Sequence, residues 1–167
     1  MLLRRIGLAS MGGGAMLALT TPIYAQEADK APPATVIKDQ RAAERLRGAE
    51  GITLQWISWD WRGRLEVRQP GETIFLKGGQ SAADGPVASL NGFPTTGKLS
   101  LDGIVTEIGH DYFHFRGTIR ITDTPDPGRA CVREGEMLFK ATGKRRYWRL
   151  QSMEACDGLT DYVDIYF

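Results

Sequence analysis

Net charge and histidine are both scarce in this chain. Its 21 basic and 20 acidic residues leave a formal charge of +1 at pH 7, and it contains two histidines. A near-neutral chain has no overall electrostatic attraction for nucleic acid or for an anionic membrane surface. We therefore do not expect nucleic acid among its partners.

The two histidines do not form a metal-binding motif. His110 and His114 are four residues apart, which on a helix would place them one turn apart. The residues around them alternate between apolar and polar, which is typical of a strand, and four residues of strand span about 13 Å. That distance is too long for both side chains to bind one ion, so we predict no metal and no other cofactor.

Signatures of catalysis are also missing. None of the serines lies in a Gly-x-Ser-x-Gly motif. The acidic segment 157–161 lacks the spacing of the twelve-residue calcium loop and is better interpreted as a turn before the last strand. We predict no catalytic residue. A hydrolase that gathers carboxylates or a histidine from distant positions stays open as an alternative.

The candidate membrane segment at the N-terminus is too short to span a bilayer. It runs uncharged for about 16 residues, from Ile6 to Thr21, whereas a spanning helix needs about 20. Arg4 and Arg5 precede it, and a short segment ending in Ala25 follows, which is the order of a secretory signal. We predict that residues 1–25 are a signal peptide, that the protein is periplasmic or secreted, and that it does not insert stably in a membrane. A retained anchor is the alternative.

Cysteine is limited to Cys131 and Cys156, both behind the predicted signal. In an oxidising compartment an even pair is expected to form a disulfide. A two-residue turn at Gly143-Lys144 suits type II′ geometry and would place the cysteines directly opposite each other in one hairpin. This register also puts Met137 opposite Leu150 and Phe139 opposite Trp148, on the same core-facing side as the cysteines. A bulge at Gly135 would shift the register by one residue.

The segment between the signal and the core is expected to be a flexible tether, residues 26–48. Asp39 is a candidate N-cap for a short helix that ends at Arg47, before Gly48. The apolar face of this helix is thin, because it consists of Ala42, Ala43 and Leu46. We therefore expect the helix to be a surface element or to be partly frayed.

From residue 49 to residue 167 the pattern is that of short strands separated by turns. Apolar and polar residues alternate over residues 112–121, where Gly117 indicates a bulge or a close approach of another backbone. Further strands are predicted at residues 52–59, 64–68, 73–77, 98–101, 104–108, 136–142, 145–151 and 161–166. A turn is expected at Asp102-Gly103, and residues 78–96 are expected to form a long loop, either a mobile surface loop or a binding loop. We predict an all-β fold, a small antiparallel β-barrel or β-sandwich of about eight strands with one N-terminal helix and one disulfide.

Tryptophan is concentrated in one segment. Trp56, Trp59 and Trp61 follow one another closely, and strand alternation would direct Trp56 to one side and the other two to the opposite side. Some of this ring area must then leave the core, where indole faces can stack on sugars or apolar ligands. Packing of all three rings in the core is the alternative.

Basic residues cluster at the predicted hairpin tip. They are Lys144, Arg145, Arg146 and Arg149, and we expect Arg129 and Arg133 to lie near this cluster. Such a cluster can bind phosphate or carboxylate groups, or it can simply be a solvated tip that prevents edge-to-edge aggregation. The residues that we predict to bind ligand are Trp59, Trp61, Arg145, Arg146 and Arg149.

The function that best fits these observations is non-enzymatic. We predict an exported binding module for an envelope ligand, either apolar or glycan, or for an envelope protein. A hydrolase of envelope polymers and a structural or assembly protein are the alternatives, and the oligomeric state is not predicted.

Overall fold

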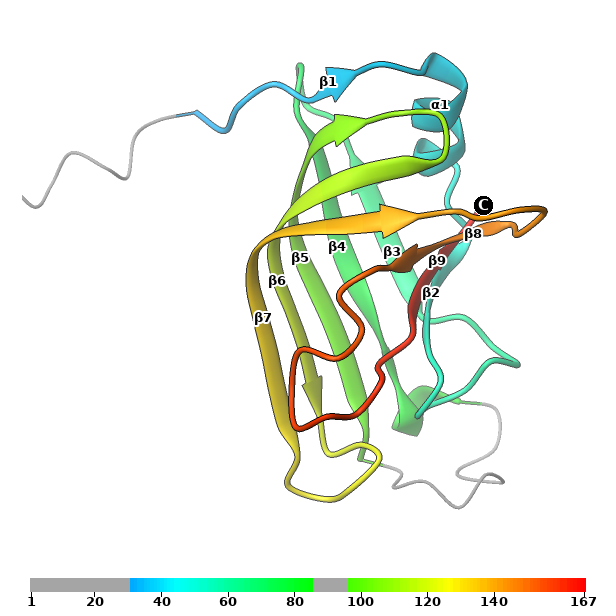
Figure 1. Cartoon of the computed structure of the whole chain (residues 1–167), viewed down its shortest axis with the longest axis vertical. Helices are drawn as coiled ribbons and strands as arrows, with labels where there is room; N and C mark the ends of the chain where they lie inside the picture. The colour runs from blue at the N-terminus through cyan, green and yellow to red at the C-terminus, as the bar shows by residue number, and fades with distance from the viewer. Residues whose placement is uncertain (1–30, 86–95) are drawn as a thin grey trace, which may run out of the picture. The chain divides into compact units, whose positions relative to one another are not determined.

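A computed structural model describes residues 31–85 and 96–167, and residues 32–167 form one compact unit. Figure 1 shows its elements in order along the chain. They are β1 (Val36–Ile37), α1 (Gln40–Arg47), β2 (Gly51–Leu54), β3 (Arg64–Arg68), β4 (Ile74–Ser81), a 3₁₀ turn at Ala82–Asp84, β5 (Lys98–Ile108), β6 (Tyr112–Thr122), β7 (Ala130–Lys140), β8 (Tyr147–Leu150) and β9 (Val163–Tyr166). The predicted signal peptide lies outside the described residues.

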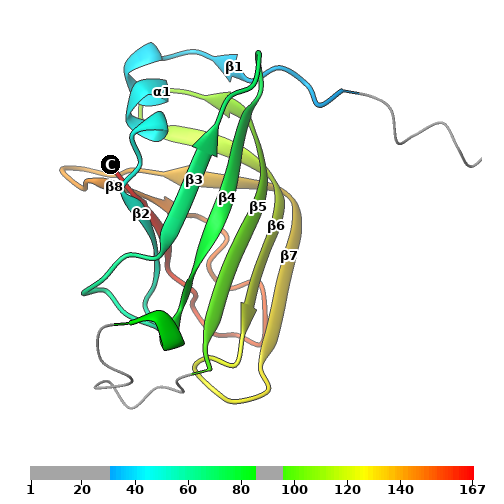
Figure 2. The same cartoon turned by 180° about the vertical axis from the view of Figure 1, so that it is seen from behind.

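The strands form one antiparallel sheet that curls into a nearly closed barrel. Its order is β2-β9-β8-β7-β6-β5-β4-β3, and β1 adds a short parallel pairing to the end of β5. An isolated bridge between Ile52 and Gly63 brings β2 back to the start of β3. Figure 2 shows these two strands from behind. This closure confirms the all-β prediction and selects the barrel, because a sandwich would leave two separate sheets.

Strand alternation fills the barrel interior with apolar side chains. Phe113 and Phe139 stack with ring centroids 4.9 Å apart, and Trp148 meets Phe113 edge-on at 5.5 Å. All three residues are fully buried. The predicted alternation over residues 112–121 is therefore confirmed, and the aromatic rings of β6, β7 and β8 form the centre of the core.

Helix α1 has the predicted ends and the predicted apolar face. The Asp39 side chain accepts a hydrogen bond of 2.8 Å from the Ala42 amide, and Gly48 forms the C-cap. Ala42, Ala43 and Leu46 are completely buried, whereas Gln40, Arg41, Glu44 and Arg47 on the opposite side are exposed, so the helix lies at the surface with its predicted apolar face against the core. Two alanines make a thin apolar face, but they also let the helix backbone approach the core closely. The helix packs into the compact unit, which begins before the predicted start at residue 49.

A row of glycines crosses three curved strands. Gly103 pairs with Gly117, and Gly117 pairs with Gly135, on β5, β6 and β7 respectively. A β-carbon on Gly117 would lie 2.6 Å from Cζ of Phe115, and one on Gly103 would lie 2.7 Å from the same atom. The close approach predicted at Gly117 is confirmed. The turn predicted at Gly103 is wrong, because this glycine lets β5 run on as one strand beneath the Phe115 ring.

The hairpin of β7 and β8 keeps its predicted core face but not its predicted register. Phe139 pairs with Leu150 instead of Trp148, so the partner is shifted by two residues. The connection from Ala141 to Arg146 is longer than two residues, with Gly143 at a φ of 62°. A shift by two preserves the side on which each side chain points, which is why Met137, Phe139, Trp148 and Leu150 are all buried as expected.

The disulfide between Cys131 and Cys156 is present, with the Cα atoms 5.8 Å apart. Its predicted setting, two cysteines directly opposed in a hairpin, is wrong. β8 ends at Leu150, so Cys156 lies in the connection to β9, and the ladder partner of Cys131 is Ile121 on β6. The bond therefore fastens an irregular segment to β7.

Two other predicted boundaries change. β2 ends at Leu54, so Trp56 and Trp59 lie in a loop instead of a strand. Gly78, Gly79, Gln80 and Ser81 belong to β4 instead of the long predicted loop, and residues 86–95 of that loop lie outside the described residues. Within the part of the chain that the structure describes, no helix is both long enough and apolar enough to cross a membrane.

We expect the Gly117→Ala variant to be destabilised. The added methyl group would meet the Asp102 carbonyl oxygen and the Phe115 ring, and overpacking of this kind costs about 1–3 kcal/mol. Urea denaturation measures the loss of unfolding free energy. Gly48→Ala is the control, because its β-carbon would lie 3.6 Å from the Glu44 carbonyl oxygen, an ordinary contact distance, and its φ is −92°. Equal stability of Gly117→Ala and wild type would contradict this packing.

Removal of the disulfide is expected to lower the free energy of unfolding by about 3 kcal/mol, because the unfolded chain regains the freedom of the closed loop. The Cys131→Ala/Cys156→Ala variant, unfolded in urea, tests this value. Treatment with a reductant should destabilise wild type by a similar amount and should leave the double variant unchanged. A double variant with wild-type stability would show that the bond adds nothing.

Candidate functional site

The outer side of β8 and β9 carries aromatic and arginine side chains. Alternation directs Trp148, Leu150, Val163 and Ile165 inward, where each is fully buried. The side chains between them therefore point outward, and the loop between β2 and β3 brings in two more. We call this surface the aromatic–arginine face; it consists of Trp59, Arg62, Arg145, Tyr147, Arg149, Tyr162 and Tyr166.

A bidentate ion pair holds the centre of the face. Arg149 Nε and Nη2 each donate a hydrogen bond of 2.7 Å to the two carboxylate oxygens of Asp164, whose side chain is 0% exposed. Burial raises the pKa of Asp164 above its ordinary value, and the bonds from Arg149 oppose that rise. The same carboxylate raises the pKa of Arg149. The guanidinium is therefore fixed in one orientation above a buried acid.

Three rings surround this guanidinium. Arg149 Cζ lies 4.1 Å from the Tyr162 ring centroid, 5.2 Å from that of Tyr147 and 5.6 Å from that of Trp59. All three distances are within the range of cation–π attraction. Trp59 is nevertheless 44% exposed, so a large part of its indole surface faces solvent.

Further arginines extend the face at both ends. Arg145 lies over the Tyr147 ring at 5.7 Å, and Arg62 lies over the Tyr166 ring at 4.3 Å. Tyr147 and Tyr166 are themselves in ring contact, with centroids 5.3 Å apart. The face is thus a continuous arrangement of alternating rings and cations, which can pack on flat apolar groups and donate hydrogen bonds beside them.

The structure brings together three of the five predicted ligand residues. Trp59, Arg145 and Arg149 lie on the face, linked through tyrosines that the sequence interpretation missed. Trp61 does not join them, because it packs partly buried against the core and its carbonyl accepts a hydrogen bond from Gln80. Arg146 is exposed, but it makes no ring contact or ion pair within the described residues.

The tyrosines of the face and Asp164 could have been found from the strands that the sequence predicts. Tyr162, Asp164 and Tyr166 occupy alternate positions in the predicted strand 161–166, so they had to share one side of it. Tyr147 and Arg149 alternate in the same way on β8. The pairing of Arg149 with Asp164 in the ladder then places the two sets side by side.

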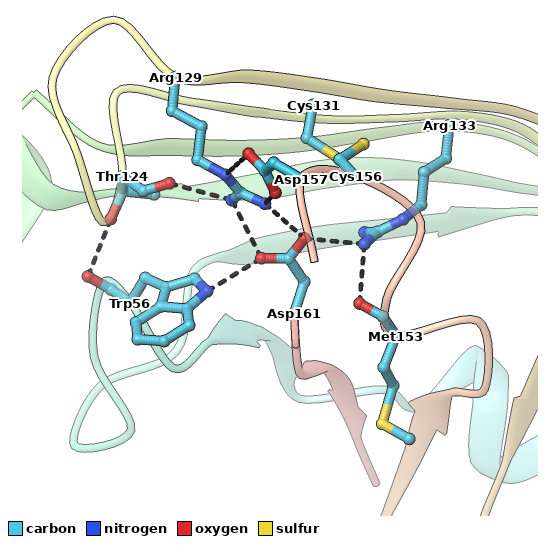
Figure 3. The surroundings of a disulfide bond; sticks show 9 residues. All are labelled: Trp56, Thr124, Arg129, Cys131, Arg133, Met153, Cys156, Asp157 and Asp161. Carbon is cyan, nitrogen blue, oxygen red and sulfur yellow. Dashed lines mark hydrogen bonds and ion pairs between the residues drawn. A yellow bond between two sulfur atoms is a disulfide. The ribbon is translucent and has the colours of Figure 1, made fainter. Parts of the chain in front are cut away.

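A second group of charged side chains lies inside one end of the barrel, beside the disulfide (Figure 3). Arg129 binds both oxygens of Asp157 and both oxygens of Asp161, and Arg133 Nη2 donates to Asp161 at 2.7 Å. The side chains of Arg129 and Arg133 are each 4% exposed. The prediction that Arg129 and Arg133 lie near the hairpin tip is therefore wrong. Both are buried at or next to the start of β7, which is the opposite end of this strand from the tip.

This buried cluster also positions the loop that carries Trp59. Asp161 accepts a hydrogen bond of 2.9 Å from Trp56 Nε1, and the Trp56 carbonyl accepts one from Thr124. On the other side of Trp59, the Trp61 carbonyl accepts a hydrogen bond of 2.8 Å from Gln80 Nε2. Tyr162 follows Asp161 directly in the chain. The Asp161 carboxylate therefore positions both the loop that carries Trp59 and the segment that carries Tyr162.

The two histidines lie apart from each other, and neither lines the two hollows described below. His110 Nδ1 lies 3.1 Å from Asp39 Oδ2, and His114 Nδ1 lies 3.5 Å from Glu136 Oε1. The two pairs are at separate surface positions. One hollow of about 340 Å³ is lined by residues 151–155, and another of about 240 Å³ lies on β4, β5 and β6. Each of these two hollows has a single carboxylate and no histidine. In the described ranges, no three histidine, cysteine or acidic side chains are grouped as metal ligands.

Comparison with known proteins identifies the family. The model of the PM1083 family matches residues 34–167. The chain belongs to the PM1083 family. It is 38% identical over 125 residues to "Uncharacterized protein PM1083" of Pasteurella multocida (strain Pm70), and the match covers 74% of each chain. No solved structure matches the chain. The family match includes all of the barrel, helix α1 and both groups of charged residues.

The ion pair of Asp157 with Arg129 makes stability depend on pH. Hydrogen bonds from Arg129 hold the pKa of Asp157 below its ordinary value of 3.8. A carboxyl that binds its proton less readily when folded contributes stability that is present above that value and is lost as the pH falls below it. We therefore expect the unfolding free energy of wild type to fall more steeply than that of Asp157→Asn between about pH 5 and pH 2.

Chemical denaturation at a series of pH values checks this expectation. The two proteins should converge at the acid end, where the Asp157 carboxyl is neutral like the asparagine amide. Curves that stay parallel over the whole range would show that the pair makes no pH-dependent contribution.

Proposed function

We propose that this protein is an exported, non-enzymatic binding module whose aromatic–arginine face binds a glycan of the cell envelope. Export is supported by the signal-like pattern of residues 1–25 and by the Cys131–Cys156 disulfide, a bond typical of oxidising compartments. The proposed site includes the predicted residues Trp59, Arg145 and Arg149. Trp61 and Arg146 are left out of it.

The observation that carries this proposal is an exposed indole beside an immobilised guanidinium. Trp59 offers ring area on which the C–H side of a sugar can pack. The hydrogen bonds to Asp164 use Nε and Nη2 of Arg149, and Nη1 makes no hydrogen bond within the described residues. Nη1 can therefore donate to a sugar hydroxyl beside the Trp59 ring. An apolar surface with a fixed donor beside it suits a sugar ring, which has both C–H groups and hydroxyl groups.

The face is also held in place before any ligand arrives. Asp164 fixes Arg149 through two hydrogen bonds. The Trp56 side chain holds the chain before Trp59, and the bond from Gln80 to the Trp61 carbonyl holds it after Trp59. A ligand that binds to ordered side chains loses little free energy in ordering them. This rigidity favours the interpretation of the face as a binding site over its interpretation as a solvated surface without a ligand.

The alternatives have less support. A hydrolase would need a second acid or a histidine in a hollow, and the two hollows described above have neither. An assembly protein would need an apolar patch on an open edge. Among the described residues, the exposed large hydrophobic side chains are Val36, Trp59 and Val132, and one of these belongs to the face.

Trp59→Ala is expected to weaken glycan binding at least tenfold, because it removes the ring on which the sugar packs; tenfold corresponds to about 1.4 kcal/mol. Affinity electrophoresis through gels that contain hydroxyethyl cellulose or polygalacturonate measures the retardation of each protein. Val132→Ala, an exposed apolar residue on the outside of β7, is the matched control and should behave as wild type. Wild-type retardation of Trp59→Ala in every gel would exclude this site.

A further inference from the structure

The positive charges of the aromatic–arginine face are not all neutralised. Arg149 is paired with Asp164, and Arg62 is paired with Glu50. Arg145 has no ion pair among the described residues, and its guanidinium lies over the ring of Tyr147. One end of the face therefore has an uncompensated cation.

The neighbourhood of Arg145 strengthens this asymmetry. The connection between β7 and β8 has the sequence Ala-Thr-Gly-Lys-Arg-Arg, which contains three cations and no acid. Lys144, Arg145 and Arg146 are all exposed in the structure. An exposed guanidinium that lacks an internal partner can form charge-assisted hydrogen bonds with an external carboxylate at little cost in desolvation.

The free cation and the exposed indole belong to the same row of side chains. From Trp59 the row passes to Arg149, then to Tyr147 and then to Arg145, in steps of 5.6, 5.2 and 5.7 Å. A linear ligand that covers this row would contact an apolar ring at one end and a cation at the other.

We propose that the ligand of this face is an acidic glycan, a linear polysaccharide whose sugar rings carry carboxylate groups. One sugar ring packs on Trp59, and the carboxylate of another sugar farther along the same chain pairs with Arg145. This inference rests on the proposed function, because it names the class of glycan that the same face binds. Charge complementarity selects an acidic chain over a neutral one.

Calorimetric titration with two forms of one polymer tests the inference. Polygalacturonate carries a carboxylate on each sugar, and its methyl ester has the same backbone without the charge. We expect the ester to bind at least tenfold more weakly at 50 mM sodium chloride. The difference should shrink at 500 mM, because the exposed pair with Arg145 is screened by salt.

Variants test whether Arg145 is responsible for the preference for the acid form. Arg145→Ala should bind the acid form as weakly as the ester and should leave binding of the ester unchanged, whereas Arg145→Lys should retain most of the preference. Arg120→Ala removes another exposed arginine, on the outside of β6, and should bind both polymers as wild type does. Trp59→Ala should weaken binding of both forms.

The outcomes separate this inference from the proposed function. Equal binding of the acid and the ester, or binding of the ester or hydroxyethyl cellulose alone, would overturn the acidic glycan and leave the glycan-binding function in place. Equal losses in Arg145→Ala and Arg120→Ala would also overturn it, because the attraction would then be unspecific. Failure of all three polymers to bind would overturn the proposed function itself.

Discussion

The buried carboxylate of Asp161 is the group on which one end of the barrel depends. Its oxygens accept hydrogen bonds from Trp56, from both terminal nitrogens of Arg129 and from Arg133. The side chain is completely buried, so the bonds replace the hydration that the charge has lost. Loss of one partner from such a group commonly costs about 3–5 kcal/mol, since the other charge stays buried without compensation.

Polar side chains are used at this end because the chain there has few ladder hydrogen bonds. Three irregular segments meet, residues 55–63, 123–129 and 151–162, and their backbone groups need other partners. Arg129 donates to the Thr124 carbonyl, Arg133 to that of Met153, and Gln80 to those of Ser58 and Trp61. Buried side chains thus do for these loops what neighbouring strands do for the rest of the barrel, and the disulfide adds a covalent tie to one of them.

The outer face uses the same principle on a smaller scale. Asp164 is also fully buried, and Arg149 covers it with two hydrogen bonds. The carboxylate therefore determines where the guanidinium lies, and the guanidinium determines where the rings of Tyr147, Tyr162 and Trp59 can pack against it. Because Arg149 and Asp164 are paired across two strands, the centre of the face has the rigidity of the sheet.

Local patterns in the sequence determined which side of β6, β7 and β8 is buried, where α1 begins and ends, and that Cys131 and Cys156 are joined. Alternation and helix caps act over a few residues, and a cysteine pair in an oxidising compartment has one partner to choose. The tertiary structure alone decided the hairpin register, the burial of Arg129 and Arg133, and the meeting of Trp59 with Tyr162 and Arg149. These features depend on contacts between residues up to about a hundred positions apart, and a register shift of two leaves the pattern of alternation unchanged, so no local signal distinguishes the possibilities.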